Sequence, residues 1–207
     1  MKHVTLPGGE VVPSMGQGTW KMGERAERRA DEIAALRAGV ELGMTLIDTA
    51  EMYGDGAAET LISEALGSVR DELFLVSKAY PQNASRSRLA GACEASLKRL
   101  GTDRLDIAFV HDCDDAPGAA LDGALPALAE LKAQGVVGAL GVGSNFAATH
   151  LALLREAELD VLMVAGRFTL LDQSAAPDLF PLCRQRGTQV ELASPFNSGI
   201  LATGPDD

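Results

Sequence analysis

The sequence has no apolar run of the roughly 20 residues that would span a bilayer, and no cluster of Lys and Arg. It carries 18 Lys and Arg against 29 Asp and Glu, a formal net charge of −11, so it offers no basic surface for nucleic acid. The three cysteines, Cys93, Cys113 and Cys183, are odd in number and far apart, and the N-terminus shows no charged and then apolar leader. We therefore expect a cytoplasmic protein that acts on a small molecule, with neither a membrane nor a nucleic acid as partner.

The length of 207 residues allows one substantial hydrophobic core. Hydrophobic residues make up 46% of the chain and charged residues 23%, which is typical of an ordinary globular protein. Nothing in the composition requires a second unit, so residues 1–207 are expected to form a single domain.

Two kinds of segment alternate along the chain after a short N-terminal motif. Two β-prone arms, 4–6 and 10–12, flank the turn-forming Pro7-Gly8-Gly9 and predict a β-hairpin. Brief, almost continuously apolar segments predict buried parallel strands at 14–18, 44–48, 73–77, 105–110, 137–143, 160–165 and 189–194. Segments with helical spacing predict helices at 26–42, 57–67, 86–100, 120–134, 147–157 and 174–186. Three of these helices are followed by Gly43, Gly101 and Gly187, where a left-handed cap is expected.

This alternation of strands and helices predicts an α/β fold with a parallel sheet, either an open doubly wound sheet or a closed barrel. Polar residues stand at the carboxyl ends of successive strands, at Asp48, Lys78, His111 and Ser144-Asn145. In a barrel these ends surround one mouth, where active sites are built.

The predicted strands number seven, whereas a complete TIM-type (β/α)₈ barrel has eight strands and usually about 250 residues. We therefore expect a barrel that is truncated after its seventh strand, a fragment incomplete at the C-terminus. Two open sheet edges invite pairing with other chains, so self-association through the open barrel seam is expected.

Four titratable residues at three consecutive strand ends suggest acid–base chemistry. A phenol with a pKa of about 10 is a poor acid at neutral pH, and a neighbouring ammonium group lowers that pKa. Lys78 would supply the positive charge to Tyr53, Asp48 would hold the lysine, and His111 would orient a carbonyl or share the proton. Tyr53 is then the predicted proton donor or acceptor.

Each of these residues also has a purely structural interpretation. Asp48 could cap a helix, Tyr53 could pack at the rim, Lys78 could be a solvated charge and His111 a hydrogen-bonded loop residue. Their occurrence together at three strand ends favours the functional interpretation.

The same residues resemble a known family. Asp48, Tyr53, Lys78 and His111, in this order and setting, resemble the catalytic tetrad of the aldo-keto reductases, and Glu59 matches the same family signature. The resemblance extends from the hairpin to the last residues, and it implies the barrel rather than the open sheet. It also implies an NAD(P)(H)-dependent oxidoreductase that interconverts carbonyls and alcohols. Cofactor contacts, with NADP(H) or NAD(H), are implied for Gly18, Thr19, Trp20, Asp48, Ser144, Asn145, Ser194, Phe196, Asn197 and Ser198.

The chain departs from the family pattern at two cofactor positions. Many members carry a Gln after the sixth strand, where this chain has the stretch 164–168 without one, and many carry a Tyr where this chain has Ala193. Both departures argue against tight cofactor binding. The family's basic segment for the adenosine phosphate follows the eighth strand, so the choice between NAD and NADP is not readable here, and we expect weak binding of NADPH.

The two halves resemble different branches of the family. The run 75–84 and the segment 92–97 are similar to bacterial carbonyl and methylglyoxal reductases, whereas 166–173 and 194–201 are similar to sugar and pyridoxal dehydrogenases. Substrate and direction stay open between carbonyl reduction and aldose oxidation.

Two further interpretations belong to other classes. The run 111–115, His-Asp-Cys-Asp-Asp, suggests a metal-dependent barrel hydrolase or lyase, although such a site needs ligands from two or three strand ends. Because His3 and His150 are the other histidines, no metal site is predicted. The third interpretation is an inactive or merely cofactor-binding fragment.

Overall fold

The computed structural model describes residues 1–6, 9–80 and 86–204, and it opens with a β-hairpin. Strands β1 (His3–Thr5) and β2 (Val11–Pro13) pair antiparallel, with Val4 opposite Val12, as predicted. The predicted turn residues Pro7 and Gly8 lie outside the described residues, as do residues 81–84 of the branch motif.

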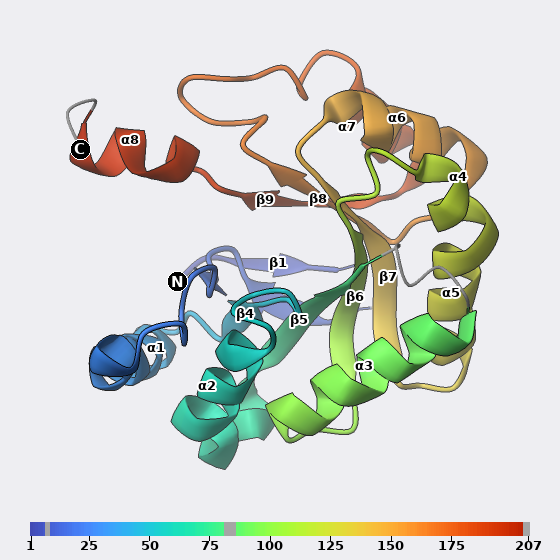
Figure 1. The fold of residues 1–207 in the computed structure, drawn as a ribbon. Helices are drawn as coiled ribbons and strands as arrows, with labels where there is room; N and C mark the ends of the chain where they lie inside the picture. Colours follow the sequence, from blue (N-terminus) through green and yellow to red (C-terminus); the bar gives the residue numbers. More distant parts are fainter. Residues whose placement is uncertain (7–8, 81–85, 205–207) are drawn as a thin grey trace.

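Seven parallel strands follow in chain order and form one sheet. These are β3 (Gln17–Gly18), β4 (Leu46–Asp48), β5 (Phe74–Ala79), β6 (Leu105–His111), β7 (Val137–Ser144), β8 (Val161–Ala165) and β9 (Gln189–Ala193). The sheet curves into an almost closed barrel with its helices on the outside (Figure 1). The predicted barrel-type fold is confirmed.

Helices connect the strands and cover the outer face of the sheet. The main ones are α1 (Arg29–Glu41), α2 (Ala57–Leu66), α3 (Arg86–Leu100), α5 (Leu125–Ala133), α6 (Ala147–Glu156) and α7 (Leu179–Arg186). Short helical segments are η1 (Ala26–Arg28), η2 (Gly67–Glu72), α4 (Pro117–Ala119), the π-helical η4 (Ala120–Ala124), η5 (Asn197–Gly199) and α8 (Ile200–Thr203). In Figure 1, α1 and α8 lie on either side of the remaining gap in the ring.

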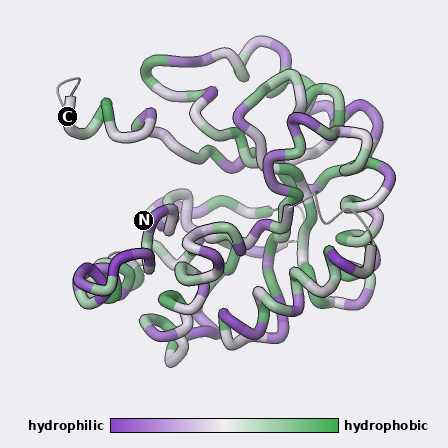
Figure 2. Tube along the Cα trace, in the orientation of Figure 1, coloured by the Kyte–Doolittle hydropathy of each residue, from purple (hydrophilic) through white to green (hydrophobic). Residues whose placement is uncertain are grey.

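The strands present two hydrophobic faces because side chains alternate along each strand. The outward face packs against the helices and forms the larger core, which includes Ile47, Leu75 and Val110. The inward face fills the barrel with a smaller cluster that includes Val76, Phe109 and Met163. Figure 2 shows the hydrophobic stretches along the strands and hydrophilic ones on the peripheral turns. A polar side chain at an inward position of a strand therefore lies inside the barrel, on the same face as this smaller cluster.

Several predicted elements are shorter than expected, among them the strand predicted at 44–48, which is Leu46–Asp48. The first strand covers only residues 17–18 of the predicted 14–18. Gly16, just before it, approaches Leu46 so closely that a Cβ atom would lie 2.5 Å from its Cδ2. The helix predicted at 174–186 is α7, which begins at Leu179 rather than at residue 174. A local turn precedes it, in which the Asp172 carboxylate accepts hydrogen bonds from Ser174 N and Oγ at 2.8 and 2.6 Å. Such side-chain bonds to nearby backbone compete with helix formation.

The three glycines expected to cap helices adopt the left-handed conformation. Their φ angles are +89° at Gly43, +69° at Gly101 and +73° at Gly187. Glycine takes this conformation at little cost, so these positions end the helices as predicted.

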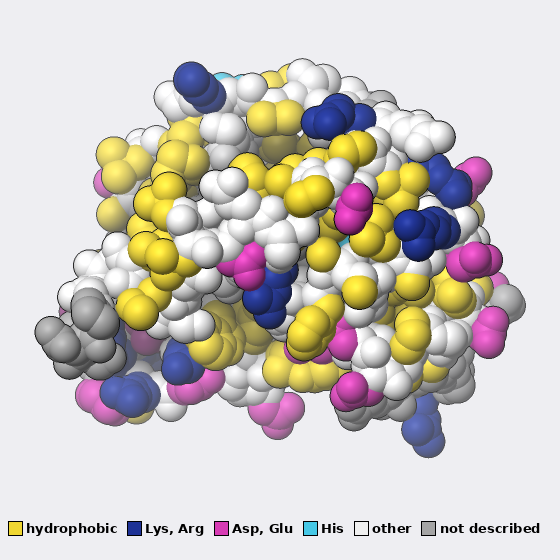
Figure 3. Space-filling view, turned by 90° about the horizontal axis from the view of Figure 1, so that it is seen from above, with side chains coloured by type: hydrophobic (Ala, Val, Ile, Leu, Met, Phe, Trp, Pro, Cys, Tyr) yellow, Lys and Arg dark blue, Asp and Glu magenta, His cyan; other side chains and the backbone are white. Residues whose placement is uncertain are grey.

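The two ends of the sheet do not pair with each other in the described part of the chain. Strand β3 pairs with β4, β9 pairs with β8, and no ladder joins β3 to β9. The segment after β8 exposes large apolar side chains, namely Leu170 (86%), Leu171 (62%), Phe196 (58%) and Ile200 (44%). Figure 3 shows hydrophobic side chains spread over the face that is uppermost in Figure 1. No helix among the described residues is long and apolar enough to cross a membrane.

Candidate active site

A buried ion pair between β4 and β5 is the centre of the candidate site. Register places Asp48 opposite Val76, and Lys78 follows two residues later on the same inward face of β5. The Lys78 Nζ atom donates to Asp48 Oδ1 at 2.6 Å and to the Thr49 carbonyl at 2.7 Å. The Lys78 side chain is 0% exposed and that of Asp48 14%. The lysine lies inside the strand rather than at its predicted end, because β5 continues to Ala79.

Tyr53 lies above this pair on the turn that leads from β4 to α2. Its hydroxyl is 3.4 Å from Lys78 Nζ, and the ammonium lies 4.9 Å from the centre of its ring. The turn continues with positive φ angles at Gly54, Asp55 and Gly56, of 59°, 53° and 84°. Such backbone is costly for a non-glycine residue such as Asp55, so strain is concentrated directly beside the phenol.

His111, the last residue of β6, completes the predicted group of four. Its ring contacts Tyr53 edge-on at a centroid distance of 6.1 Å and stacks on Tyr80 at 5.6 Å. Its Nδ1 atom is buried and has no hydrogen-bond partner in the described part of the chain. Burial, together with the charge of Lys78, lowers the pKa of His111 to about 3, so the imidazole is neutral at physiological pH.

The protonation states of the other three residues differ in one respect from expectation. Burial raises the pKa of Tyr53 above its ordinary value and outweighs the lowering effect of Lys78, while the charge of Asp48 raises it further. The predicted lowering of this pKa is therefore wrong. Burial also raises the pKa of Asp48, whereas for Lys78 the charge of Asp48 overcomes the opposing effect of burial and raises the pKa. Tyr53 thus carries its proton and Lys78 its charge.

The first group of predicted cofactor residues, Gly18, Thr19 and Trp20, lies beside this pair. Gly18 is opposite Asp48, and a Cβ atom there would meet nothing within 4 Å. Thr19 donates both its backbone N–H and its hydroxyl to the Asp48 carbonyl at 3.0 Å, so this side chain supports the strand end. Trp20 is 57% exposed with Lys21 over its ring. The geometry leaves open space over Gly18 and an exposed indole at the same mouth.

The second group, Ser144 and Asn145, ends β7. Ser144 Oγ donates to an Asp114 carboxylate oxygen, and Asn145 Nδ2 donates to Asp112 Oδ1 at 3.5 Å. Ser144 does not cap α6, whose N-cap residue is Phe146 and has no side-chain cap bond. Both polar side chains are therefore held by acids of the loop after β6.

The third group, Ser194, Phe196, Asn197 and Ser198, follows β9. Left-handed backbone occurs at Ser194, Asn197 and Ser198, with φ angles of 53°, 50° and 58°. Non-glycine residues in this region are strained, and such strain is concentrated at ligand sites. The Asn197 Oδ1 atom is buried without a hydrogen-bond partner in the described part of the chain. An orphaned polar atom in strained backbone fits a loop that binds a polar ligand.

Two residues near the site were not predicted from the sequence. Arg167 stands in the stretch without the family's Gln, donates to the Asn145 carbonyl at 2.5 Å and lies over the Phe146 ring at 5.6 Å. Glu191 points into the barrel from β9, two residues before Ala193. A carboxylate inside an apolar parallel strand was the available sequence signal, since such strands are otherwise almost continuously hydrophobic.

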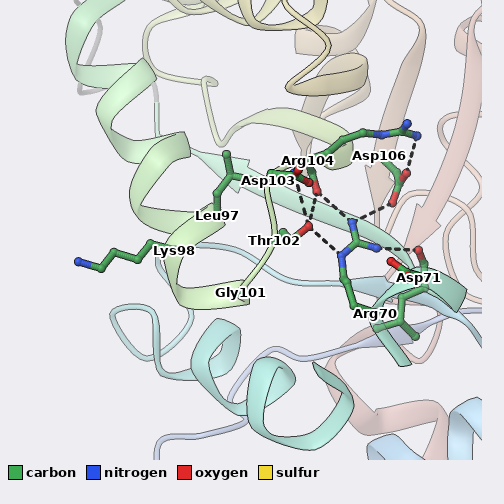
Figure 4. Close-up of a pocket in the computed structure, with 10 residues that line it drawn as sticks. Arg70, Asp71, Leu97, Lys98, Gly101, Thr102, Asp103, Arg104 and Asp106 are labelled. Carbon is green, nitrogen blue, oxygen red and sulfur yellow. Dashed lines mark hydrogen bonds and ion pairs between the residues drawn. The ribbon is translucent and has the colours of Figure 1, made fainter. Parts of the chain in front are cut away.

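A polar pocket lies at the opposite end of the barrel (Figure 4). Arg70 spans it, donating to Thr102 Oγ1 at 2.9 Å and to the carbonyls of Leu73 and Arg104 at 3.0 Å each. Asp106 accepts from the Leu75 N–H at 2.7 Å. These bonds join the amino ends of β5 and β6, where barrel residues typically serve stability. Among the described residues, no group of three or more His, Cys, Asp and Glu could hold a metal ion.

Comparison with known proteins decides the family. A model described as the aldo/keto reductase family matches residues 14–207. The chain belongs to this family. This aldo-keto reductase is 40% identical to methylglyoxal reductase YeaE of Escherichia coli (strain K12), in an alignment covering 98% of this chain and 71% of that protein. It is 33% identical to D-threo-aldose 1-dehydrogenase of a Pseudomonas species, over 94% of this chain and 69% of that protein.

Solved structures agree with this assignment. A Klebsiella pneumoniae aldo/keto reductase in complex with NADP and acetate superposes with a TM-score of 0.86 and 39% identity, over 98% of this chain and 71% of that chain. The thermostable aldo-keto reductase Tm1743, in complex with the inhibitor epalrestat, gives 0.85 and 30%, over 98% and 76%. The predicted family and oxidoreductase class are confirmed, while the roles of individual residues stay predictions.

Proposed function

We propose that this aldo-keto reductase reduces small aldehydes with NADPH, and that Tyr53 donates the proton. The observation that carries the proposal is the position of the Tyr53 hydroxyl, 3.4 Å from the buried ammonium of Lys78 and beside the neutral ring of His111. Bound NADP and NADPH in the Klebsiella relatives support the choice of cofactor. The higher identity with the methylglyoxal reductase supports the substrate class.

The chain's own residues would move and hold a proton. Tyr53 is protonated in the free protein because burial raises its pKa, so it can donate to a carbonyl oxygen that accepts a hydride. The Lys78 ammonium then stabilises the tyrosinate that remains, and Asp48 keeps the ammonium charged and fixed in place. His111, neutral and with a free Nδ1 atom among the described residues, would orient the carbonyl oxygen.

The residues present fit a nicotinamide dinucleotide. Open space over Gly18, beside Asp48, suits a flat ring, and the strained loop around Asn197 with its orphaned oxygen suits the polar remainder of the cofactor. When bound, the cofactor supplies the hydride. Ser144 and Asn145 would hold its carboxamide. To do so, their side chains must give up their hydrogen bonds to Asp114 and Asp112 and form hydrogen bonds to the cofactor instead.

The direct test is steady-state reduction of methylglyoxal, followed as oxidation of NADPH, in the chain and in its Tyr53→Phe variant. We expect turnover to fall by about 10²–10⁴-fold with little change in NADPH binding, because only the transferred proton is lost. The matched control is Tyr80→Phe, which removes the second phenol of the site but not the proposed donor. Equal turnover in the parent and the Tyr53→Phe variant would contradict the proposal.

A second candidate is oxidation of aldoses by the same residues in reverse. It is favoured by the relative that is named D-threo-aldose 1-dehydrogenase and by the similarity of residues 166–173 and 194–201 to the dehydrogenase branch. In that direction Tyr53 would accept the proton. Parallel measurements of kcat/KM for an aldose with NADP and for methylglyoxal with NADPH decide between the two.

A further inference from the structure

Asp112, the residue after β6, brings to the candidate site a carboxylate that takes no part in the proposed proton transfer. Side chains alternate along a strand, so regular extended backbone would turn this residue away from the interior that His111 faces. Instead Asp112 has a φ angle of 47°, in the left-handed region, which interrupts the alternation. Its Oδ2 atom lies 3.8 Å from His111 Nε2. The carboxylate therefore lies beside the imidazole of the candidate site.

Two phenols border the same imidazole. The His111 ring contacts Tyr53 edge-on at 6.1 Å and stacks on Tyr80 at 5.6 Å. In agreement with this geometry, the negative charge of Asp112 contributes to raising the pKa of both tyrosines. Asp112 thus lies next to the place where the proposed reaction puts the carbonyl group, between Tyr53 and His111.

One oxygen of this carboxylate is available to a ligand. Oδ1 accepts a long hydrogen bond of 3.5 Å from Asn145 Nδ2. Oδ2 accepts none from the described residues, since 3.8 Å to His111 Nε2 is beyond hydrogen-bond length. The Asp112 side chain is 36% exposed and keeps part of its hydration, so it is an anion at neutral pH, although burial and the charge of Asp114 raise its pKa.

A substrate hydroxyl would reach this oxygen. A hydroxyl on the carbon next to the carbonyl lies about 3 Å from the carbonyl oxygen, because only short covalent bonds separate the two. With the carbonyl oxygen at Tyr53 and His111, that hydroxyl comes to the edge of the imidazole, where Oδ2 of Asp112 lies. A hydrogen bond to an ionised acceptor is roughly twice as strong as one between neutral groups.

We propose that Asp112 is a specificity-determining residue that accepts a hydrogen bond from a substrate hydroxyl on the carbon next to the carbonyl. The preferred substrates are then short 2-hydroxyaldehydes such as glyceraldehyde. Propanal has the same carbon chain without hydroxyls, so it leaves the carboxylate without a donor. The inference rests on the proposed function and adds the substrate class to it.

The first test measures binding without turnover. The chain has one tryptophan, Trp20, which is 57% exposed at the same mouth, so its fluorescence follows the binding of a ligand there. With NADP present, glyceraldehyde should bind saturably, and Asp112→Asn should weaken this binding by about 10-fold and leave propanal unchanged. Asparagine has the size of aspartate and tolerates left-handed backbone, but it carries no charge. Glyceraldehyde that does not saturate, or that binds equally to both chains, overturns the proposal.

The second test measures kcat/KM with NADPH for glyceraldehyde and for propanal. The ratio of the two values should fall by about 10-fold in Asp112→Asn. The matched control is Asp115→Asn, which removes the same charge from an exposed position of the same loop and should leave the ratio unchanged. If Asp112→Asn weakens NADPH binding but keeps the ratio, the carboxylate serves only to hold Asn145, and the proposal is overturned.

The two tests separate this proposal from the proposed function. A chain that binds the two aldehydes with the expected difference but reduces neither contradicts the proposed function and leaves the role of Asp112 intact. A chain that reduces both aldehydes with the same ratio in the parent and in Asp112→Asn overturns the role of Asp112 and leaves the proposed function intact.

Discussion

Replacement of Lys78 by methionine tests the ion pair at the centre of the candidate site. Methionine keeps the aliphatic stem but removes an ammonium group that is 0% exposed and lies 2.6 Å from Asp48 Oδ1. Removing one partner of a buried pair leaves an uncompensated charge, so we expect the free energy of unfolding to fall by about 3–5 kcal/mol. Tyr53 loses its electrostatic support at the same time, and turnover should fall by about 10²–10⁴-fold.

A second substitution separates these two effects. The double variant Lys78→Met with Asp48→Asn buries no charge, so much of the lost stability should return while turnover stays low. Urea denaturation gives the free energies of unfolding, and NADPH oxidation with methylglyoxal gives turnover. A loss of less than about 1 kcal/mol in the single variant would refute the buried ion pair. Parent-like turnover in either variant would refute the role of the ammonium.

Two further predictions concern stability and association. His111 and His150 are buried with pKa values below those of the unfolded chain, so at these two residues the unfolded state binds more protons, and their contribution to stability should be lost as pH drops from about 6.5 toward 3. Because Asp48 and Asp112 have raised pKa values and act in the opposite sense, the test compares two chains: between about pH 7 and pH 5 the parent should lose more unfolding free energy than His150→Leu, and an equal pH dependence in both would contradict the prediction. In the described part of the chain the edges of β3 and β9 stay unpaired, so we expect self-association, and a monomer in light scattering after size exclusion would contradict this prediction.

The position of the catalytic candidates was predictable because parallel strands share one geometry. Each apolar segment ends at the same side of the barrel, so Asp48, Lys78 and His111 converge even though they are far apart in sequence. The sign of the pKa shift at Tyr53 could not be predicted in the same way. That sign depends on burial by neighbours from several strands, which outweighs the single attractive charge of Lys78.

The surroundings of the candidate cofactor residues were less predictable for a related reason. Similarity identified Ser144 and Asn145 but not their partners, because Asp114 and Asp112 belong to a loop 30 and 33 positions earlier in the sequence. Glu191 could be noticed as an acid in an apolar strand, but only the register reveals that it faces the same interior as the candidate site. The periodicity of the sequence does not show which loops contact one another or which residues face each other across the barrel.

Glu59 links two outer helices to the strand that carries Lys78. This family-signature residue on α2 is 0% exposed, and it accepts hydrogen bonds from Ser77 Oγ at 2.7 Å and from Arg99 Nε on α3 at 2.6 Å. Ser77 points outward and its neighbour Lys78 inward, because side chains alternate along β5. The carboxylate thus fixes β5 to two helices directly behind the lysine. Since positioning of a charged group within a fraction of an ångström controls its effect on a reaction, we expect the buried Glu59 anchor to support the proposed reaction through the strand, without touching the substrate.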